Sequence, residues 1–175
     1  FQTLTKADDI RDFEIEGISI GDSLLDYFSK KEIQKSPKGT RYKDKTYTTA
    51  NFKIDNSDSF EMLMISYKSN DYNYKIVGVG GFNNYKEAHL KCYKKQDKIS
   101  AELKNLFPNS KTYETRIILL KGIDDGSTTR QDHIELINGD IGVQCKKYGK
   151  VLKKKYNDNL TVSIFSTDYN FWLVN

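Results

Sequence analysis

The sequence is poor in the residues on which special folds and metal sites depend. It has 2 cysteines, 2 histidines, 2 prolines and 11 glycines among 175 residues. This composition excludes collagen and a coiled coil, and a chain of this length needs no dense disulfide framework to hold its core. A run of about 18 apolar residues, which a membrane-spanning helix requires, is also absent. We therefore expect a soluble globular domain with no transmembrane segment.

The length fits a single domain over 1–175, without internal repeats. Apolar residues recur every three or four positions over 84–107, which predicts a long amphipathic helix. We divide the chain into a helical N-terminal segment over 1–38, strands over 45–82, the helix over 84–107, strands over 111–165 and a C-terminal tail over 166–175.

Strand-like runs lie before and after the expected helix, without a βαβ rhythm. Asn138-Gly139 separates two of them and predicts a type I′ turn with positive φ at both residues. The fold class is therefore α+β: a mostly antiparallel sheet of about six or seven strands, one long helix on one face, and short N-terminal helices. The expected strands cover 47–54, 60–67, 74–82, 111–121, 132–137, 140–146 and 160–165.

The two cysteines point toward the same core. Cys92 falls on the apolar face of the expected helix, and Cys145 alternates inward with Ile141 and Val143 on a strand. If the helix packs on the sheet, a disulfide between Cys92 and Cys145 closes a loop of about 54 residues. The alternative is a pair of buried, inert thiols.

A short run resembles the catalytic serine block of a known enzyme family. Residues Gly21-Asp22-Ser23-Leu24 match the nucleophile block of the GDSL esterases, in which the serine attacks an ester carbonyl. The resemblance covers only these residues and implies a serine hydrolase that uses Ser23. The alternative is structural: Gly21 turns the chain, and Asp22 or Ser23 caps a short helix.

The partners of such a serine are missing from the sequence. The family's general base is a histidine three residues after an aspartate near the chain end. The residue three positions before His133 is Arg130, and the residue three positions before His89 is Lys86; neither is an aspartate. No histidine follows Lys146. We therefore assign no catalytic residue and expect a protein that is not an enzyme, with hydrolysis as an alternative.

Three further patterns lack the spacing of a metal or phosphate site. On a strand, His133 and Glu135 share one face whereas Asp132 points to the other. The loop 122–129 lacks the alternating acids of a calcium site. The glycine run 78–81 has no following Lys-Ser or Lys-Thr, so its glycines are expected to admit a close helix or a bulge. No metal or cofactor is expected.

A lysine-rich stretch contains Tyr148 and Tyr156 between its lysines, within a chain of net charge +4. Basic residues interleaved with aromatics are typical of single-stranded nucleic-acid binders. A solvated hairpin explains the same stretch, and acidic residues are scattered through the rest of the chain. We therefore do not expect nucleic acid as the main partner, and it stays an alternative.

Three runs carry a resemblance that spans most of the chain: 7–28, with Asp-Asp-Ile-Arg-Asp-Phe near its start, 91–99 and 157–162. They resemble a group of small exported proteins of A/T-rich marine alphaproteobacteria. In that group the first run follows a signal peptide, which implies a periplasmic or secreted location. The chain begins at Phe1 rather than Met, so we expect a processed or a trimmed product from which any targeting segment has already been removed. The resemblance implies no activity.

Taken together, these patterns predict an exported binding or envelope-accessory domain that recognises a protein or envelope component. Its binding surface is expected on the sheet face that the helix leaves uncovered, or on its loops. A serine hydrolase and a single-stranded nucleic-acid binder are the alternatives. A bridged Cys92–Cys145 pair would agree with export, because disulfides persist in oxidising compartments.

Overall fold

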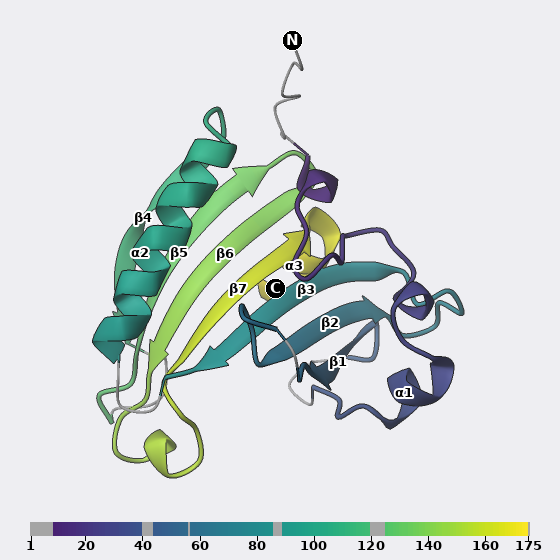
Figure 1. Cartoon of the computed structure of the whole chain (residues 1–175), viewed down its shortest axis with the longest axis horizontal. Coiled ribbons are helices and arrows are strands. Elements are labelled where there is room, and N and C mark those ends of the chain that lie inside the picture. Colours follow the sequence, from purple (N-terminus) through teal and green to yellow (C-terminus); the bar gives the residue numbers. More distant parts are fainter. Residues whose placement is uncertain (1–8, 40–43, 56, 86–88, 120–124, 175) are drawn as a thin grey trace.

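The computed structural model describes residues 9–39, 44–55, 57–85, 89–119 and 125–174. In these residues seven strands form one antiparallel sheet in the order β1-β2-β3-β7-β6-β5-β4, shown in Figure 1. The last strand of the sequence, β7, therefore lies at the centre of the sheet. The strands are β1 (Tyr47–Lys53), β2 (Met62–Lys68), β3 (Ile76–Asn84), β4 (Lys111–Leu119), β5 (Thr128–Leu136), β6 (Gly139–Lys147) and β7 (Asn159–Ser166).

Helix α2 (His89–Leu106) packs on β5, β6 and β7. Its buried residues, Cys92, Gln96, Ser100 and Leu103, follow one another at intervals of three or four, so they form a single stripe toward the sheet. The other helices are short: α1 (Lys30–Lys35), α3 (Thr167–Val174) and the 3-10 turns η1 (Ile10–Asp12), η2 (Leu24–Asp26) and η3 (Leu152–Lys154).

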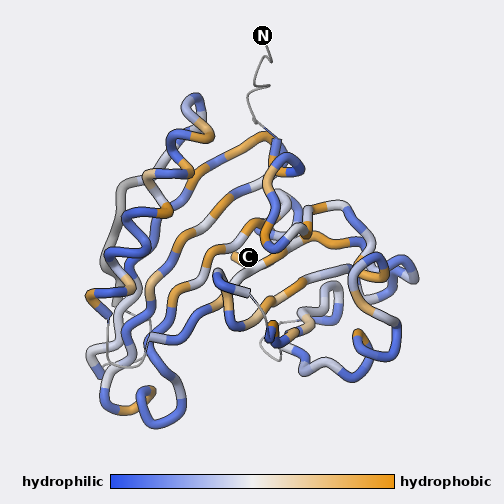
Figure 2. Tube along the Cα trace, in the orientation of Figure 1, coloured by the Kyte–Doolittle hydropathy of each residue, from blue (hydrophilic) through white to orange (hydrophobic). Residues whose placement is uncertain are grey.

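The main core lies between the sheet and two coverings, helix α2 and the N-terminal segment 10–33. Figure 1 shows both coverings on the same side of the sheet. In Figure 2 the central strands carry most of the hydrophobic positions, whereas α2 is largely hydrophilic. Strands supply Ile65, Val79, Ile141, Leu160 and Ile164, each 0% exposed.

Helix α3 covers part of the opposite face. Ile164 belongs to the main core, whereas its neighbour Phe165 packs with the second cluster around Tyr169, because successive strand residues point to opposite faces. Tyr169 is 1% exposed, and its hydroxyl accepts a hydrogen bond of 2.8 Å from Ser66 Oγ. A buried polar network therefore helps to hold α3 on the sheet.

The predicted α+β class, with its antiparallel sheet and one long helix, is confirmed. Several bounds differ. Asn84 is the last residue of β3, and α2 begins at His89, with 86–88 outside the described residues. The expected tail 166–175 instead contains α3, because Tyr169 has a buried place on the sheet.

The predicted turn at Asn138-Gly139 is shifted by one residue. Leu136 pairs with Gly139, so the turn residues are Ile137 and Asn138, and of these only Asn138 has a positive φ, at 67°. Gly139 is the first residue of β6 and serves close packing instead, because a Cβ there would lie 2.1 Å from Ile10 Cδ1. The type I′ prediction was therefore wrong, although the hairpin itself is present.

Candidate functional site

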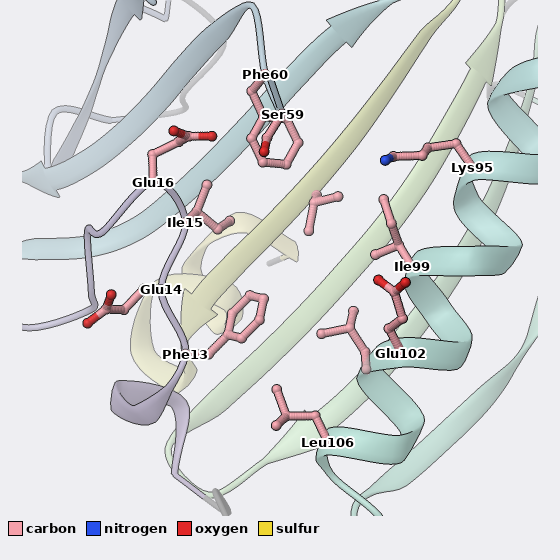
Figure 3. A pocket seen from close by; sticks show the side chains of 12 residues that line it. Phe13, Glu14, Ile15, Glu16, Ser59, Phe60, Lys95, Ile99, Glu102 and Leu106 are labelled. Carbon is pink, nitrogen blue, oxygen red and sulfur yellow. The ribbon is translucent and has the colours of Figure 1, made fainter. Parts of the chain in front are cut away.

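A groove of about 380 Å³ opens between the N-terminal segment and helix α2, above the centre of the sheet. Figure 3 shows its two walls, with Phe13 and Ile15 on one and Ile99 and Leu106 on the other. Val162 of β7 also lines it, together with Phe60 from the β1–β2 connection. The groove therefore has a mainly apolar interior built from four separate parts of the chain.

The N-terminal wall has little regular secondary structure, yet it is firmly held. Ile15 and Ile18 exchange two backbone hydrogen bonds of 3.1 Å, and both side chains are 3% exposed. Between them Glu16 and Gly17 adopt positive φ values of 54° and 74°, which produce the tight turn. The Phe13 ring meets Phe107 edge to face at 6.0 Å. The wall is thus tied to the core and to the end of α2.

The opposite wall is α2, which is fixed to the sheet by a disulfide between Cys92 and Cys145. Gln96 adds hydrogen bonds to Asp132 Oδ2 at 3.1 Å and to the Val143 carbonyl at 3.0 Å. Because Ile99, Glu102 and Leu106 recur at three- and four-residue spacing beside this anchored stripe, they face the groove together.

Gly81 leaves room for the aromatic part of the groove. A Cβ at this position would lie 2.5 Å from Phe60 Cγ, so only a glycine lets the Phe60 ring rest directly on β3. Gly78 makes room for Tyr169 of α3 in the same way, because a Cβ at Gly78 would lie 2.9 Å from Tyr169 Cε1. The sequence predicts a close helix or a bulge at these glycines. The helix at Gly78 is α3 rather than the long helix, Gly81 admits Phe60 instead, and the β2–β3 register shifts beside Ser66 and Tyr67.

Charged side chains surround the apolar interior. Glu16 and Glu102 stand on opposite walls, with Glu14 further along the N-terminal wall and Lys95 on α2, all exposed. Figure 3 shows Lys95 and Glu102 extending from α2 toward the other wall. Ser57 Oγ donates a 2.7 Å hydrogen bond to Glu16, which orients that carboxylate. The lining residues thus contribute three carboxylates and one ammonium, so the rim has a net negative charge.

The GDSL-like run has a structural role here. Ser23 Oγ accepts a hydrogen bond from the Leu25 N–H at 3.2 Å and donates one to the Asn73 carbonyl at 2.7 Å, so it caps η2. Asp22 accepts the Tyr27 hydroxyl at 2.5 Å, and this bond together with burial raises the pKa of Tyr27 to about 12. Gly21 turns the chain at φ 98°.

The structure does not bring Ser23 and His133 together. Ser23 bridges Lys75 just before β3, whereas His133 lies on β5, three strands further along the sheet. Three strand spacings amount to about 14 Å, far beyond hydrogen-bond reach. Asp132 is 5% exposed beneath α2, on the face opposite to His133 and Glu135, as the alternation predicts. Among the described residues, no group of His, Cys, Asp and Glu has the arrangement of a metal site.

The lysine-rich stretch forms the connection between β6 and β7. Here Tyr148 and Tyr156 pack with ring centroids 5.4 Å apart, and Lys155 Nζ lies 5.3 Å from the Tyr156 ring centre. Asp125, from the predicted loop 122–129, accepts hydrogen bonds of 3.0 Å from the Val151 and Leu152 N–H groups. Residues 122–124 of that loop lie outside the described part of the chain.

Sequence reasoning found the cysteine pair and the helix but missed the groove. Its N-terminal wall offers no periodic signal, since Phe13, Ile15 and Ile18 are spaced irregularly. The contact between Phe60 and Gly81 joins distant segments that only the folded sheet brings together. Comparisons with models of protein families, with curated proteins and with solved structures find no match for this chain.

Proposed function

We propose that the protein is an exported binding domain whose groove holds a segment of another protein. The segment carries apolar side chains beside lysine or arginine, and the domain acts by binding rather than by catalysis. The observation that supports this most directly is the groove itself: an apolar interior, between two anchored walls, under a rim with three carboxylates. Ligand sites in proteins are commonly concave, largely apolar and preformed in this way.

The size and lining of the groove suit side chains rather than a whole folded surface. Its volume of about 380 Å³ is near the lower end of small-ligand pockets, which hold roughly 300–1,000 Å³. Phe13 and Phe60 present aromatic rings, and aromatic residues often carry most of the energy of a protein interface. One or two apolar side chains of a partner would fill this space.

The rim selects the charge of the partner. Glu14, Glu16 and Glu102 outnumber Lys95, and the rim stays negative when Lys98 is counted, whose Nζ forms an ion pair of 3.8 Å with Glu102. A basic residue beside the apolar side chains is therefore favoured, and an acidic one is disfavoured, since complementary charge sets specificity and the rate of association.

Export is supported by the disulfide. Cys92 and Cys145 are both 1% exposed and bonded, and such bonds form and persist outside the reducing cytosol. The sequence resemblance to exported proteins implies the same location. A protein or envelope component on the outer side of the inner membrane is the corresponding class of partner.

The test is an NMR titration of the isotope-labelled, oxidised protein with a panel of peptides. Each peptide has the same apolar core, flanked by lysine, glutamate or serine. We expect saturable shift changes that cluster at Phe13, Ile99 and Leu106, strongest for the lysine-flanked series and weakened by salt. Uniform or absent shifts would contradict the proposal.

A matched pair of variants separates the groove from the rest of α2. Leu106 is 49% exposed and lines the groove, whereas Leu90 is 67% exposed on the same helix outside it. Leu106→Lys should abolish binding of the lysine-flanked peptide, and Leu90→Lys should leave it unchanged. Equal effects of the two substitutions would rule out the groove as the site.

A further inference from the structure

We propose that the protein docks on an anionic lipid surface through a second region, which we call the basic end. The basic end comprises residues 146–156, which are the last two residues of β6 and most of the β6–β7 connection, together with Leu90 and Lys94 of α2. It is distinct from the groove and goes beyond the function proposed above. Figure 1 shows the β6–β7 connection and the start of α2 at the same end of the sheet.

The elements of the basic end are held close together. Asn84 at the end of β3, Lys146 of β6 and Asn159 of β7 are neighbours in the sheet register. Cys92, in the first turn of α2, is bonded to Cys145, and its Sγ lies 3.4 Å from the Asn159 carbonyl oxygen. The first turn of α2 therefore sits at the base of the β6–β7 connection.

The stretch 146–156 is strongly basic, and two acids beside it, Asp125 and Asp158, form hydrogen bonds within it. Six lysines and no acidic residue occur over 146–155. Asp125 accepts the Val151 and Leu152 N–H groups, and Asp158 accepts the Tyr148 N–H at 2.9 Å. Their carboxylates therefore shape the connection from within. The residues exposed on its outer side include Lys150, Lys153, Lys154 and Lys155.

Exposed aliphatic residues stand among these lysines. Val151 is 64% exposed between Lys150 and the run of lysines that follows it. Leu90 is 67% exposed, and Lys94 shares its side of α2 at the i, i+4 spacing. In Figure 2 the connection is hydrophilic except for a hydrophobic patch within its turn. Lysines around a few aliphatic residues match the boundary between lipid headgroups and acyl chains.

A lipid surface fits this region better than a nucleic acid does. The rings of Tyr148 and Tyr156 lie 5.4 Å apart at an angle of 32°, so each covers one face of the other rather than offering it to a base. An aliphatic tip such as Val151 gains little against a phosphate backbone but inserts readily between headgroups. The disulfide also favours a compartment that has membranes and little nucleic acid.

The experiment is flotation of the oxidised protein with vesicles of phosphatidylcholine, alone or mixed with phosphatidylglycerol. We expect binding to the mixed vesicles only, and its loss as salt rises, since the Debye length falls from about 10 Å at 0.1 M to about 3 Å at 1 M. Absence of binding to the mixed vesicles, or equal binding to phosphatidylcholine alone, would overturn the proposal.

Variants locate the contact. Lys150→Gln with Lys154→Gln should weaken binding about 25-fold, from roughly fivefold for each lysine near an anionic surface. The control, Lys30→Gln with Lys31→Gln, removes the same charge from exposed positions on α1 and should keep nearly full binding. Val151→Ser leaves the net charge unchanged but removes an apolar side chain, so it should weaken binding about fivefold.

Two outcomes of the variants would overturn the proposal. An equal loss in the control pair would mean a response to net charge rather than to the basic end. Tighter binding of a single-stranded oligonucleotide than of the mixed vesicles, lost in Lys150→Gln with Lys154→Gln, would assign the region to nucleic acid instead. Circular dichroism and the intact mass of each oxidised variant verify that the fold and the disulfide are retained.

Discussion

Ser23 illustrates how one side chain serves structure where its sequence context suggests chemistry. Its hydroxyl joins the start of η2 to the Asn73 carbonyl, and His133 lies three strands away. We predict that Ser23→Ala lowers the free energy of unfolding by about 1 kcal/mol, the usual cost of losing a helix cap. Urea denaturation measures this loss. Labelling of Ser23 by a fluorophosphonate would contradict the structural role.

Asp125 contributes to the stability of the folded protein in a way that depends on pH. The Ser127 hydroxyl and the N–H groups of Leu152 and Val151 hold the pKa of Asp125 below its ordinary value. A carboxyl with a lowered pKa stabilises the folded state above the pKa of the unfolded chain, and this contribution is lost as the pH falls through the folded value. We therefore predict that unfolding curves of the wild type and of Asp125→Ala differ at neutral pH and converge below about pH 4.

A control for Asp125 is available in Asp71, which accepts hydrogen bonds in the β2–β3 connection. The Asp71→Ala variant removes a carboxylate of the same type far from the β6–β7 connection. In NMR spectra of the two variants, the amide signals of Val151 and Leu152 should change in Asp125→Ala and stay unchanged in Asp71→Ala. A stability difference for Asp125→Ala that is the same at every pH would contradict the prediction.

At the scale of elements, the disulfide fixes α2 to the sheet across 53 residues of sequence. Closing a loop of this length restricts the unfolded chain, and the chain-entropy estimate is about 4 kcal/mol. We predict that the Cys92→Ala, Cys145→Ala double variant loses stability of this order in urea denaturation. Adding a reductant should lower the stability of the wild type and leave the double variant unchanged. A reductant-sensitive double variant would contradict the assignment.

Gly81 sets the shape of the groove. In Gly81→Ala the new methyl group meets the Phe60 ring, so Phe60 must move and peptide binding in the groove should be lost, with a stability cost of about 1–3 kcal/mol. Gly80→Ala is the matched control, because its methyl points to the opposite face, 3.3 Å from the flexible end of Met64. The same peptide titration measures both. Unchanged binding in Gly81→Ala would contradict this role.

Elements with strong periodic patterns were predictable from the sequence, and those fixed by tertiary contacts were not. The spacing of Cys92, Gln96 and Leu103 predicts α2. The alternation around Cys145 predicts that its side chain faces the same core. Helix α3 has no comparable stripe, since its last residues are uniformly apolar, and Tyr169 is placed by tertiary contacts such as those with Gly78 and Ser66. The groove was missed for the same reason.

At the scale of the whole molecule, the sheet joins the two halves of the chain through the pairing of β3 with β7. Because the core runs without interruption beneath both halves, we predict one cooperative unfolding transition. Fluorescence of Trp172, which lies beside Tyr169, and far-ultraviolet circular dichroism should give coincident curves. Two separated transitions would contradict a single-domain chain.

The central position of β7 also governs the order in which the molecule assembles. Gly78 of β3 pairs with Phe165 of β7, which comes 87 residues later in the sequence. Until β7 is available, both β3 and β6 present open edges. Such distant pairing makes folding slow, and unpaired edges attract other chains. A chain that emerges from its N-terminus during synthesis therefore cannot close this sheet until β7 has emerged, so the edges of β3 and β6 stay open to other chains until that moment.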